Sequence, residues 1–310
     1  MSEQGVSADV TKESVEVAKE LSEAEQGESA RVAVVAAPQH TDADGTDDEE
    51  QDDGEEEVDD PDILSDLPDD MEDIVLIHSR LKSLGRLGIP RFKNLKRLTL
   101  RQNFISSLDL ETFQDLTELE ELDLYDNSLK GIGDALTKCT NLGSLDLSFN
   151  LIRHVPDALS HLTSLRTIYF VQNKISHITG FDGVGATLRS LELGGNRIRK
   201  IEGLDALVNL EELWLGKNKI GKLENLGNLK KLKILSIQSN RITKIENIEG
   251  LENLEELYLS HNGVEKIEGL EQNIKLRTLD LTSNFVKELE NVSHLKTLEE
   301  LWASTCPHFA

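Results

Sequence analysis

The chain has 310 residues, of which 38% are hydrophobic, and a formal net charge of -25. This length and composition allow a folded core in one or two domains. The negative charge is concentrated in residues 1–73, which hold 27 acids and 3 bases, whereas residues 74–310 hold 31 acids and 30 bases. The N-terminus is polar and no apolar run has the length of a membrane span, so neither secretion nor membrane insertion is expected. Cys139 and Cys306 are far apart in the sequence, which argues against a disulfide framework and favours a reducing compartment, the nucleus or the cytoplasm.

The N-terminal segment includes the run TDADGTDDEEQDDGEEEVDDPD, which has no aromatic residue and one large aliphatic residue. Such a composition cannot bury enough apolar surface to offset the entropy of ordering, so residues 1–60 are expected to form a disordered acidic tail. Two interpretations stay open: a tail that keeps the protein in solution, or an acidic arm that attracts basic partners or modulates binding. The stretch ARVAVVAAP within this range is apolar, but too short to found a domain.

An asparagine recurs along the chain at spacings of 24, 23 and 22 residues. Each is preceded by L-x-x-L-x-L-x-x and followed by aliphatic residues two and five positions later, which is the leucine-rich repeat. The predicted fold is an α/β solenoid, a horseshoe with a concave parallel β-sheet and short helical or irregular convex segments. Each asparagine amide can donate and accept at the bend after its strand, so these residues are predicted to be structural. The asparagine ladder comprises Asn103, Asn127, Asn150, Asn173, Asn196, Asn218, Asn240, Asn262 and Asn284.

The ends of the repeat region depart from the pattern. Residues 61–84 are predicted to hold an N-terminal cap and a first partial repeat, with 62–73 as a short helical cap. The solenoid is expected to run over residues 85–306, followed by a tail at 307–310. No capping sequence follows Trp302, so the last turn is expected to fray. We expect a monomer, with self-association through this uncapped end.

The residues four positions before the repeat asparagines, and before Cys306, which takes the asparagine position in the last repeat, are predicted to face away from the core, on the concave surface. We call these positions the concave column. Four of the five Trp and Tyr residues of the chain lie in it, and Tyr125 lies on the same face two positions further along its strand. Aromatic side chains supply apolar contact area, and carboxylates next to them select basic groups on a partner. The predicted partner-binding residues, all in or beside this column, are Asp146, Tyr169, Glu192, Trp214, Tyr258, Asp280, Glu300 and Trp302.

The sequence contains no pattern typical of catalysis. The histidines have no triad or metal-ligand spacing, and no Walker loop, nucleophile elbow or C-x-x-C motif occurs. We therefore expect no enzyme activity, no metal and no cofactor. Acids outnumber bases on the concave face, which disfavours nucleic acid as a partner.

The strings LELGGNRIRKIEGL, LWLGKNKIGKLENL, LSIQSNRITKIENIEGL and LYLSHNGVEKIEGL resemble the 22-residue repeats of the leucine-rich-repeat regulatory subunit 7 family of protein phosphatase type 1. The resemblance covers about residues 74–303. It implies binding of the phosphatase catalytic subunit through the concave face, control of its assembly and nuclear activity, and a role in mitosis and chromosome segregation. The family's contact residues carry over onto Asp146, Glu192, Asp280, Glu300 and Trp302, and Tyr169 and Trp214 occupy positions where the family can use phenylalanine. The family continues with further repeat sequence and a capping segment past the position of Trp302.

A second hypothesis assigns the binding to the N-terminal tail. Under it the chain is an acidic nuclear repeat protein of the histone-chaperone or ribonucleoprotein-assembly kind. Deleting residues 1–60 would then abolish binding of basic proteins, whereas phosphatase binding through the concave face would persist.

Overall fold

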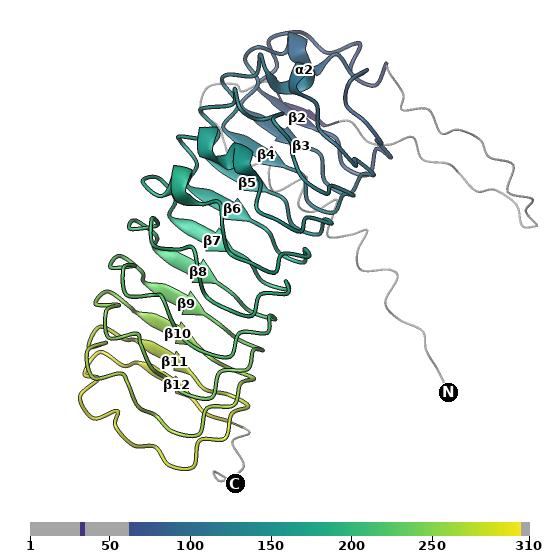
Figure 1. Ribbon diagram of the computed structural model, residues 1–310. Coiled ribbons are helices and arrows are strands. Elements are labelled where there is room, and N and C mark those ends of the chain that lie inside the picture. The colour runs from purple at the N-terminus through teal and green to yellow at the C-terminus, as the bar shows by residue number, and fades with distance from the viewer. Residues whose placement is uncertain (1–31, 35–61, 305–310) are drawn as a thin grey trace, which may run out of the picture. The chain divides into compact units, whose positions relative to one another are not determined.

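The computed structural model describes residues 32–34 and 62–304. In this part of the chain, short strands form one parallel sheet in which each strand pairs with the next strand of the sequence (Figure 1). This order confirms the predicted solenoid. The strands are β1 (Val32–Val34), β2 (Asp73–Val75), β3 (Arg97–Thr99), β4 (Glu121–Asp123), β5 (Ser144–Asp146), β6 (Thr167–Tyr169), β7 (Ser190–Glu192), β8 (Glu212–Trp214), β9 (Ile234–Ser236), β10 (Glu256–Tyr258), β11 (Thr278–Asp280) and β12 (Glu300–Trp302).

The core is built from the aliphatic positions of the repeat pattern. In the repeat of Asn218, Leu210, Leu213 and Ile220 are fully buried. Leu213 is the middle residue of β8, and successive side chains of a strand point to opposite faces, so Trp214 faces outward. One continuous apolar cluster runs from the first described repeat to the last.

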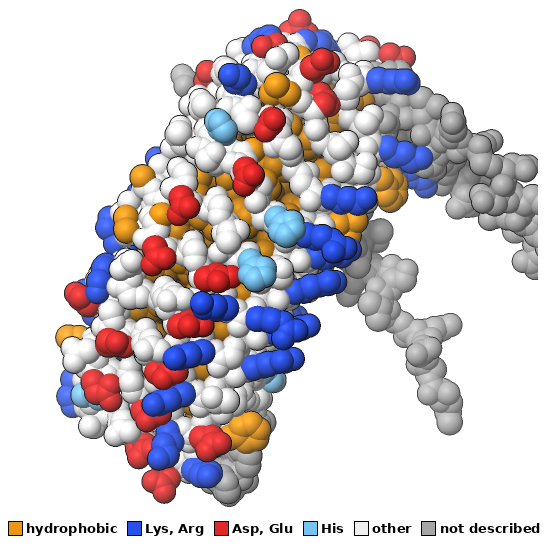
Figure 2. All heavy atoms as spheres, viewed as in Figure 1, with side chains coloured by type: hydrophobic (Ala, Val, Ile, Leu, Met, Phe, Trp, Pro, Cys, Tyr) orange, Lys and Arg blue, Asp and Glu red, His pale blue; other side chains and the backbone are white. Residues whose placement is uncertain are grey.

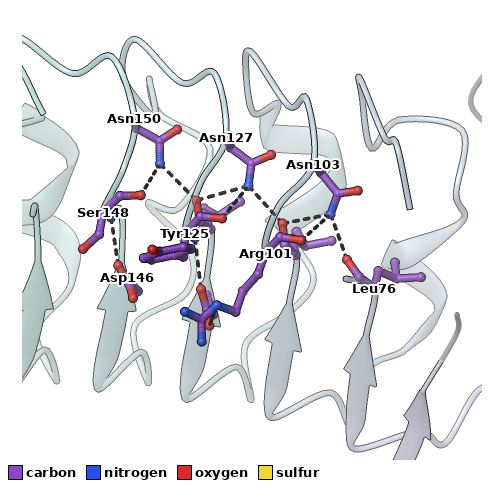
Figure 3. A network of polar contacts seen from close by, with 11 residues as sticks. Leu76, Arg101, Asn103, Tyr125, Asn127, Asp146, Ser148 and Asn150 are labelled. Carbon is purple, nitrogen blue, oxygen red and sulfur yellow. Dashed lines mark hydrogen bonds and ion pairs between the residues drawn. The ribbon is translucent and has the colours of Figure 1, made fainter. Parts of the chain in front are cut away.

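The asparagine ladder connects neighbouring repeats, as predicted (Figure 3). Asn127 donates through Nδ2 to the carbonyl oxygens of Leu100 in the preceding repeat and of Leu124 in its own, at 2.9 and 3.1 Å. Its Oδ1 accepts the N–H of Ile105 at 3.0 Å. The amide thus satisfies backbone groups that the bend leaves without partners, and the contact to the preceding repeat recurs along the whole ladder.

The segments that return from one strand to the next contain little helix. The described helices are η1 (Ile89–Arg91), α2 (Leu110–Phe113), η2 (Asp157–His161) and η3 (Asp182–Val184). Asp109 caps α2 by accepting the N–H of Thr112 at 2.8 Å. From β7 to β12, where the strands recur every 22 residues, the connections are turns and bends without a helix. Among the described residues, no helix is long and apolar enough to cross a membrane.

The N-terminal end differs from the sequence-based expectation in two respects. Residues 62–72 form turns and bends in place of the helical cap expected over 62–73, although Leu64 and Met71 enter the core. Pro68 interrupts the segment, and the Arg91 guanidinium fixes it by donating to the Leu64 carbonyl at 2.6 Å. Within the range expected to be a disordered tail, Val32–Val34 form β1, which pairs with the free edge of β2.

The remaining residues of 1–60, the predicted tail at 307–310 and Cys306 lie outside the described part of the chain. The last described strand, β12, pairs with β11 in the same register as the earlier strands. Since the described residues do not show where one part of the chain ends and the next begins, the domain boundaries at 60, 84 and 306 stay predictions.

Candidate partner-binding face

The strand register aligns the concave column. Each column residue is the third residue of its strand, and each pairs with the column residue of the next strand. The pairing continues through β12. From β5 onward, the column reads Asp146, Tyr169, Glu192, Trp214, Ser236, Tyr258, Asp280 and Trp302. The structure therefore brings seven of the eight predicted binding residues into one row, and Glu300 lies two residues before Trp302 on the same strand.

Trp214 and Tyr258 form a stacked pair in the middle of this row. Their ring centroids are 6.4 Å apart and their planes differ by 17°. The strands that carry the two rings, β8 and β10, lie two strand spacings apart, or about 9.6 Å. Because the ring centroids are closer together than the strands, the rings lean toward each other across β9. Ser236, on the strand between them, is only 2% exposed. The pair forms a joint aromatic surface that remains half-buried in the free chain.

The Tyr258 hydroxyl donates to Glu256 on the same strand at 2.7 Å. Burial, this hydrogen bond and the nearby carboxylates raise the pKa of Tyr258 to about 12. The phenol therefore stays neutral and holds its ring in place.

Carboxylates lie to either side of the aromatic pair. Burial raises the pKa of Glu192, and the charge of Asp146 raises it further. Burial also raises the pKa of the Tyr169 hydroxyl, together with the charges of Asp146, Glu192 and Glu212. Within the described residues, no ion pair neutralises Asp146, Glu192 or Glu212. A partner cation placed here would relieve this accumulation of negative charge.

Asp280 departs from the expectation that the whole column faces solvent. It is 5% exposed, and it accepts the N–H of Thr282 at 2.9 Å. Tyr258 and Trp302 lie beside it on the flanking strands, and Trp302 is 49% exposed. Its carboxylate is thus already hydrogen-bonded to its own backbone, and its contact with a partner stays a prediction.

The first repeats carry a different cluster. The Arg101 guanidinium lies 3.5 Å from the carboxylate of Asp123 and 4.4 Å from the centroid of the Tyr125 ring (Figure 3). The Tyr125 ring contacts Phe149, with centroids 4.8 Å apart. Tyr125 belongs to the concave face expected from the sequence, whereas Phe149 is a functional candidate that only the structure reveals. The sequence signal for Phe149 is a large aromatic residue directly before a ladder asparagine, where other repeats have Gln, Asp, Gly, Lys, Ser or His.

The described residues contain no group of three or more His, Cys, Asp or Glu side chains arranged to hold a metal ion. The Cys139 thiol is buried and donates toward the carbonyl of Phe113, and burial raises its pKa to about 12. A thiol with this pKa stays protonated at neutral pH, which makes it a poor nucleophile.

The repeats of this chain match models of a known protein family. Models of the leucine rich repeat match residues 71–129, 93–152 and 118–175, and a model of two such repeats matches residues 186–228 and 230–272. The chain is a leucine-rich-repeat protein. Among solved structures, this leucine-rich-repeat protein is similar to an internalin (inlF) from Listeria monocytogenes, with a TM-score of 0.68 and 25% sequence identity. That likeness covers 78% of this chain and 70% of the internalin.

Two curated proteins are similar over part of the repeats. One is the protein phosphatase 1 regulatory subunit SDS22 of Saccharomyces cerevisiae, which is 52% identical over 81 residues, or 26% of this chain. The other is the protein phosphatase 1 regulatory subunit SDS22 of Schizosaccharomyces pombe, which is 50% identical over 70 residues, or 22% of this chain. The chain spans 24% and 19% of the length of these two relatives.

Proposed function

We propose that this leucine-rich-repeat protein is a non-enzymatic regulatory subunit that binds the catalytic subunit of protein phosphatase 1 through the concave column. Two lines support the proposal: the partial identity with the two SDS22 proteins, and the surface that the column presents. The observation that carries it is the stacked pair of Trp214 and Tyr258 beside carboxylates without ion pairs. This is the composition of an interface centre that takes a basic protein surface.

The length of the column fits a folded protein partner. Neighbouring strands lie about 4.8 Å apart, so the seven intervals from Asp146 to Trp302 span about 34 Å. A small molecule cannot contact a row of this length, whereas one face of a folded domain can. Trp214, Tyr258 and Trp302 serve as anchors in this proposal, and Glu192 and Glu300 pair with Lys or Arg of the phosphatase.

The biological setting of the proposed function rests on the resemblance to the phosphatase regulatory subunit family. We infer that the chain controls phosphatase activity or assembly in the nucleus and during mitosis and chromosome segregation, and that it is found in nucleus and cytoplasm.

Calorimetric titration of the purified phosphatase catalytic subunit with the full chain tests the interface. Trp214→Ala is expected to weaken binding by about 30-fold, or ~2 kcal/mol, because it removes one ring of the central pair. The matched control is Phe104→Ala, which removes an aromatic side chain that is 53% exposed and lies outside the column. Equal affinities for the wild type and Trp214→Ala would refute the concave column as the binding surface.

A further inference from the structure

A row of basic side chains follows the turns after strands β5 to β9. The turns at residues 149–154, 172–177, 195–200, 217–222 and 239–244 contain ten Lys and Arg residues and no Asp or Glu. We call these ten side chains the basic ribbon. They are Arg153, Lys174, Arg197, Arg199, Lys200, Lys217, Lys219, Lys222, Arg241 and Lys244. Figure 2 shows Lys and Arg side chains gathered along one flank of the solenoid.

Most of the basic ribbon has no counter-charge. Lys222 and Lys244 pair with Glu246 and Glu268 of the following repeats, at 3.9 and 3.8 Å. Within the described residues, none of the other eight side chains of the ribbon forms an ion pair. Seven of these eight side chains are exposed and Lys174 is half-buried, so all of them are accessible to a ligand.

The opposite flank, where the chain enters the strands, is different. There the bases alternate with acids and pair with them across repeats, as Lys96 does with Glu72 at 2.9 Å and Lys233 with Glu211 at 2.6 Å. The same chain thus neutralises one flank and leaves the other positive. An unneutralised row of positive charge over five consecutive repeats fits an extended acidic ligand.

We propose that the basic ribbon binds the acidic segment 42–60 of the same chain. This segment contains 13 Asp and Glu residues and no Lys, Arg or His, and it is therefore complementary in charge to the ribbon. Because it is covalently attached, its effective concentration at the ribbon is on the order of millimolar, higher than that of a separate acidic ligand.

The length of the connection permits this contact. Segment 42–60 lies between β1 and Asp62, both at the N-terminal end of the sheet, and 27 residues separate Val34 from Asp62. A loop of this length, held at both ends, reaches at most about 45 Å from its anchors. The ribbon lies three to seven strand spacings from β2, or about 14 to 34 Å, whereas β12 lies about 48 Å away. The segment therefore reaches the ribbon but not the last repeat.

Zero-length carbodiimide cross-linking of the full chain, followed by peptide mapping, tests the contact. This reagent joins a lysine amine to a carboxylate within ion-pair distance. We expect cross-links from segment 42–60 to Lys200, Lys217 and Lys219 in monomeric protein. Their yield is expected to fall at least about fivefold in ~0.5 M NaCl, because salt screens exposed charges. The ion pair between Lys233 and Glu211, at 2.6 Å, serves as the internal reference between variants at the same salt concentration.

Arginine variants identify the surface without removing the reactive lysines. The triple variant Arg153→Glu, Arg197→Glu, Arg241→Glu is expected to lower these cross-links at least about fivefold, since like charges then face the segment. The control variant Arg86→Glu, Arg166→Glu, Arg277→Glu changes the net charge equally outside the ribbon and is expected to retain them.

Three outcomes would overturn the proposal. Equal losses in both triple variants would mean that overall charge, not the ribbon, attracts the segment. Cross-links spread evenly over lysines outside the ribbon, such as Lys138 and Lys275, would mean that it has no fixed site. Cross-links found only in dimers would mean that the ribbon takes the segment of a second copy.

Discussion

Glu192 lies in the centre of the concave column, between Tyr169 and Trp214 on the neighbouring strands. Burial and the charge of Asp146 raise its pKa in the folded chain. A carboxyl group whose pKa is raised by folding destabilises the folded state at pH values above that pKa, where it must carry its charge. Glu192 therefore costs stability at neutral pH, a pattern that is typical of side chains kept for binding.

Replacing Glu192 with Gln is expected to separate stability from binding. Glu192→Gln removes the buried charge and so raises Tm at neutral pH by up to a few degrees, while phosphatase affinity falls at least about fivefold. The gain in Tm is expected to shrink as the pH falls through the raised pKa of Glu192, because the wild-type side chain then becomes neutral. Scanning calorimetry over pH and titration with the phosphatase measure both effects, with the exposed Glu249→Gln as control. A lower Tm for Glu192→Gln at neutral pH would contradict this account.

In the last six repeats of the asparagine ladder, from Asn173 to Asn284, the turn on the convex side follows a second rule, which the leucine and asparagine pattern does not reveal. Seven residues after the ladder asparagine, the backbone has positive φ, and the position holds Gly or Asn: Gly180, Gly203, Asn225, Asn247, Gly269 and Asn291. The asparagines also bond across repeats, as Asn225 does by donating to the Ile201 carbonyl at 2.7 Å. Within this turn Lys222 pairs with Glu246 at the surface, whereas the last Gly or Asn is required by the backbone conformation.

Gly203 provides a test of this turn. Its φ is +65°, and a Cβ built on it would lie 2.1 Å from the carbonyl oxygen of Ile178. Gly203→Ala is therefore expected to lower the free energy of unfolding by about 2–4 kcal/mol, through left-handed backbone strain and a backbone clash. The control Gly221→Ala adds a Cβ in open space, and its effect is expected to stay within about 0.5 kcal/mol of zero. Urea unfolding of both variants measures the difference, and equal midpoints would show that the turn adapts to the side chain.

Across the whole molecule, exposed apolar side chains gather in the last described repeats. Phe285 and Leu289 are 55% and 54% exposed, and Trp302 is nearly half exposed. Apolar side chains that are exposed in the terminal repeats of a solenoid favour contact with another protein surface.

We therefore predict weak self-association of the chain through this end. Sedimentation velocity over an about hundredfold range of concentration is expected to show a monomer that passes into dimer as concentration rises. The pair Leu289→Lys, Trp302→Lys is expected to keep the protein monomeric, whereas Val208→Lys, an equally exposed apolar position in a middle repeat, should leave the association unchanged. A monomeric wild type over the whole range would show that these side chains do not self-associate.

The amino-acid sequence by itself determined the solenoid, the positions of the strands, the structural role of the asparagines and the composition of the concave column. These features repeat with a fixed period, so nine copies report the same local geometry, and the strand alternation then places Trp214 and Glu192 on the outer face. Pattern alone is sufficient for such features because they arise within one repeat.

Only the tertiary structure decided the features that depend on contacts between repeats. Trp214 leans toward Tyr258 across a strand that holds the small Ser236, and Asp280 is buried although it belongs to the concave column. Ion pairs across repeats neutralise the opposite flank, whereas eight side chains of the basic ribbon form no ion pair within the described residues. The pairing of Val32–Val34 with β2 joins segments about 40 residues apart, for which a periodic pattern gives no signal. Each of these features depends on which side chains meet across the stack, and that is settled only when the repeats pack.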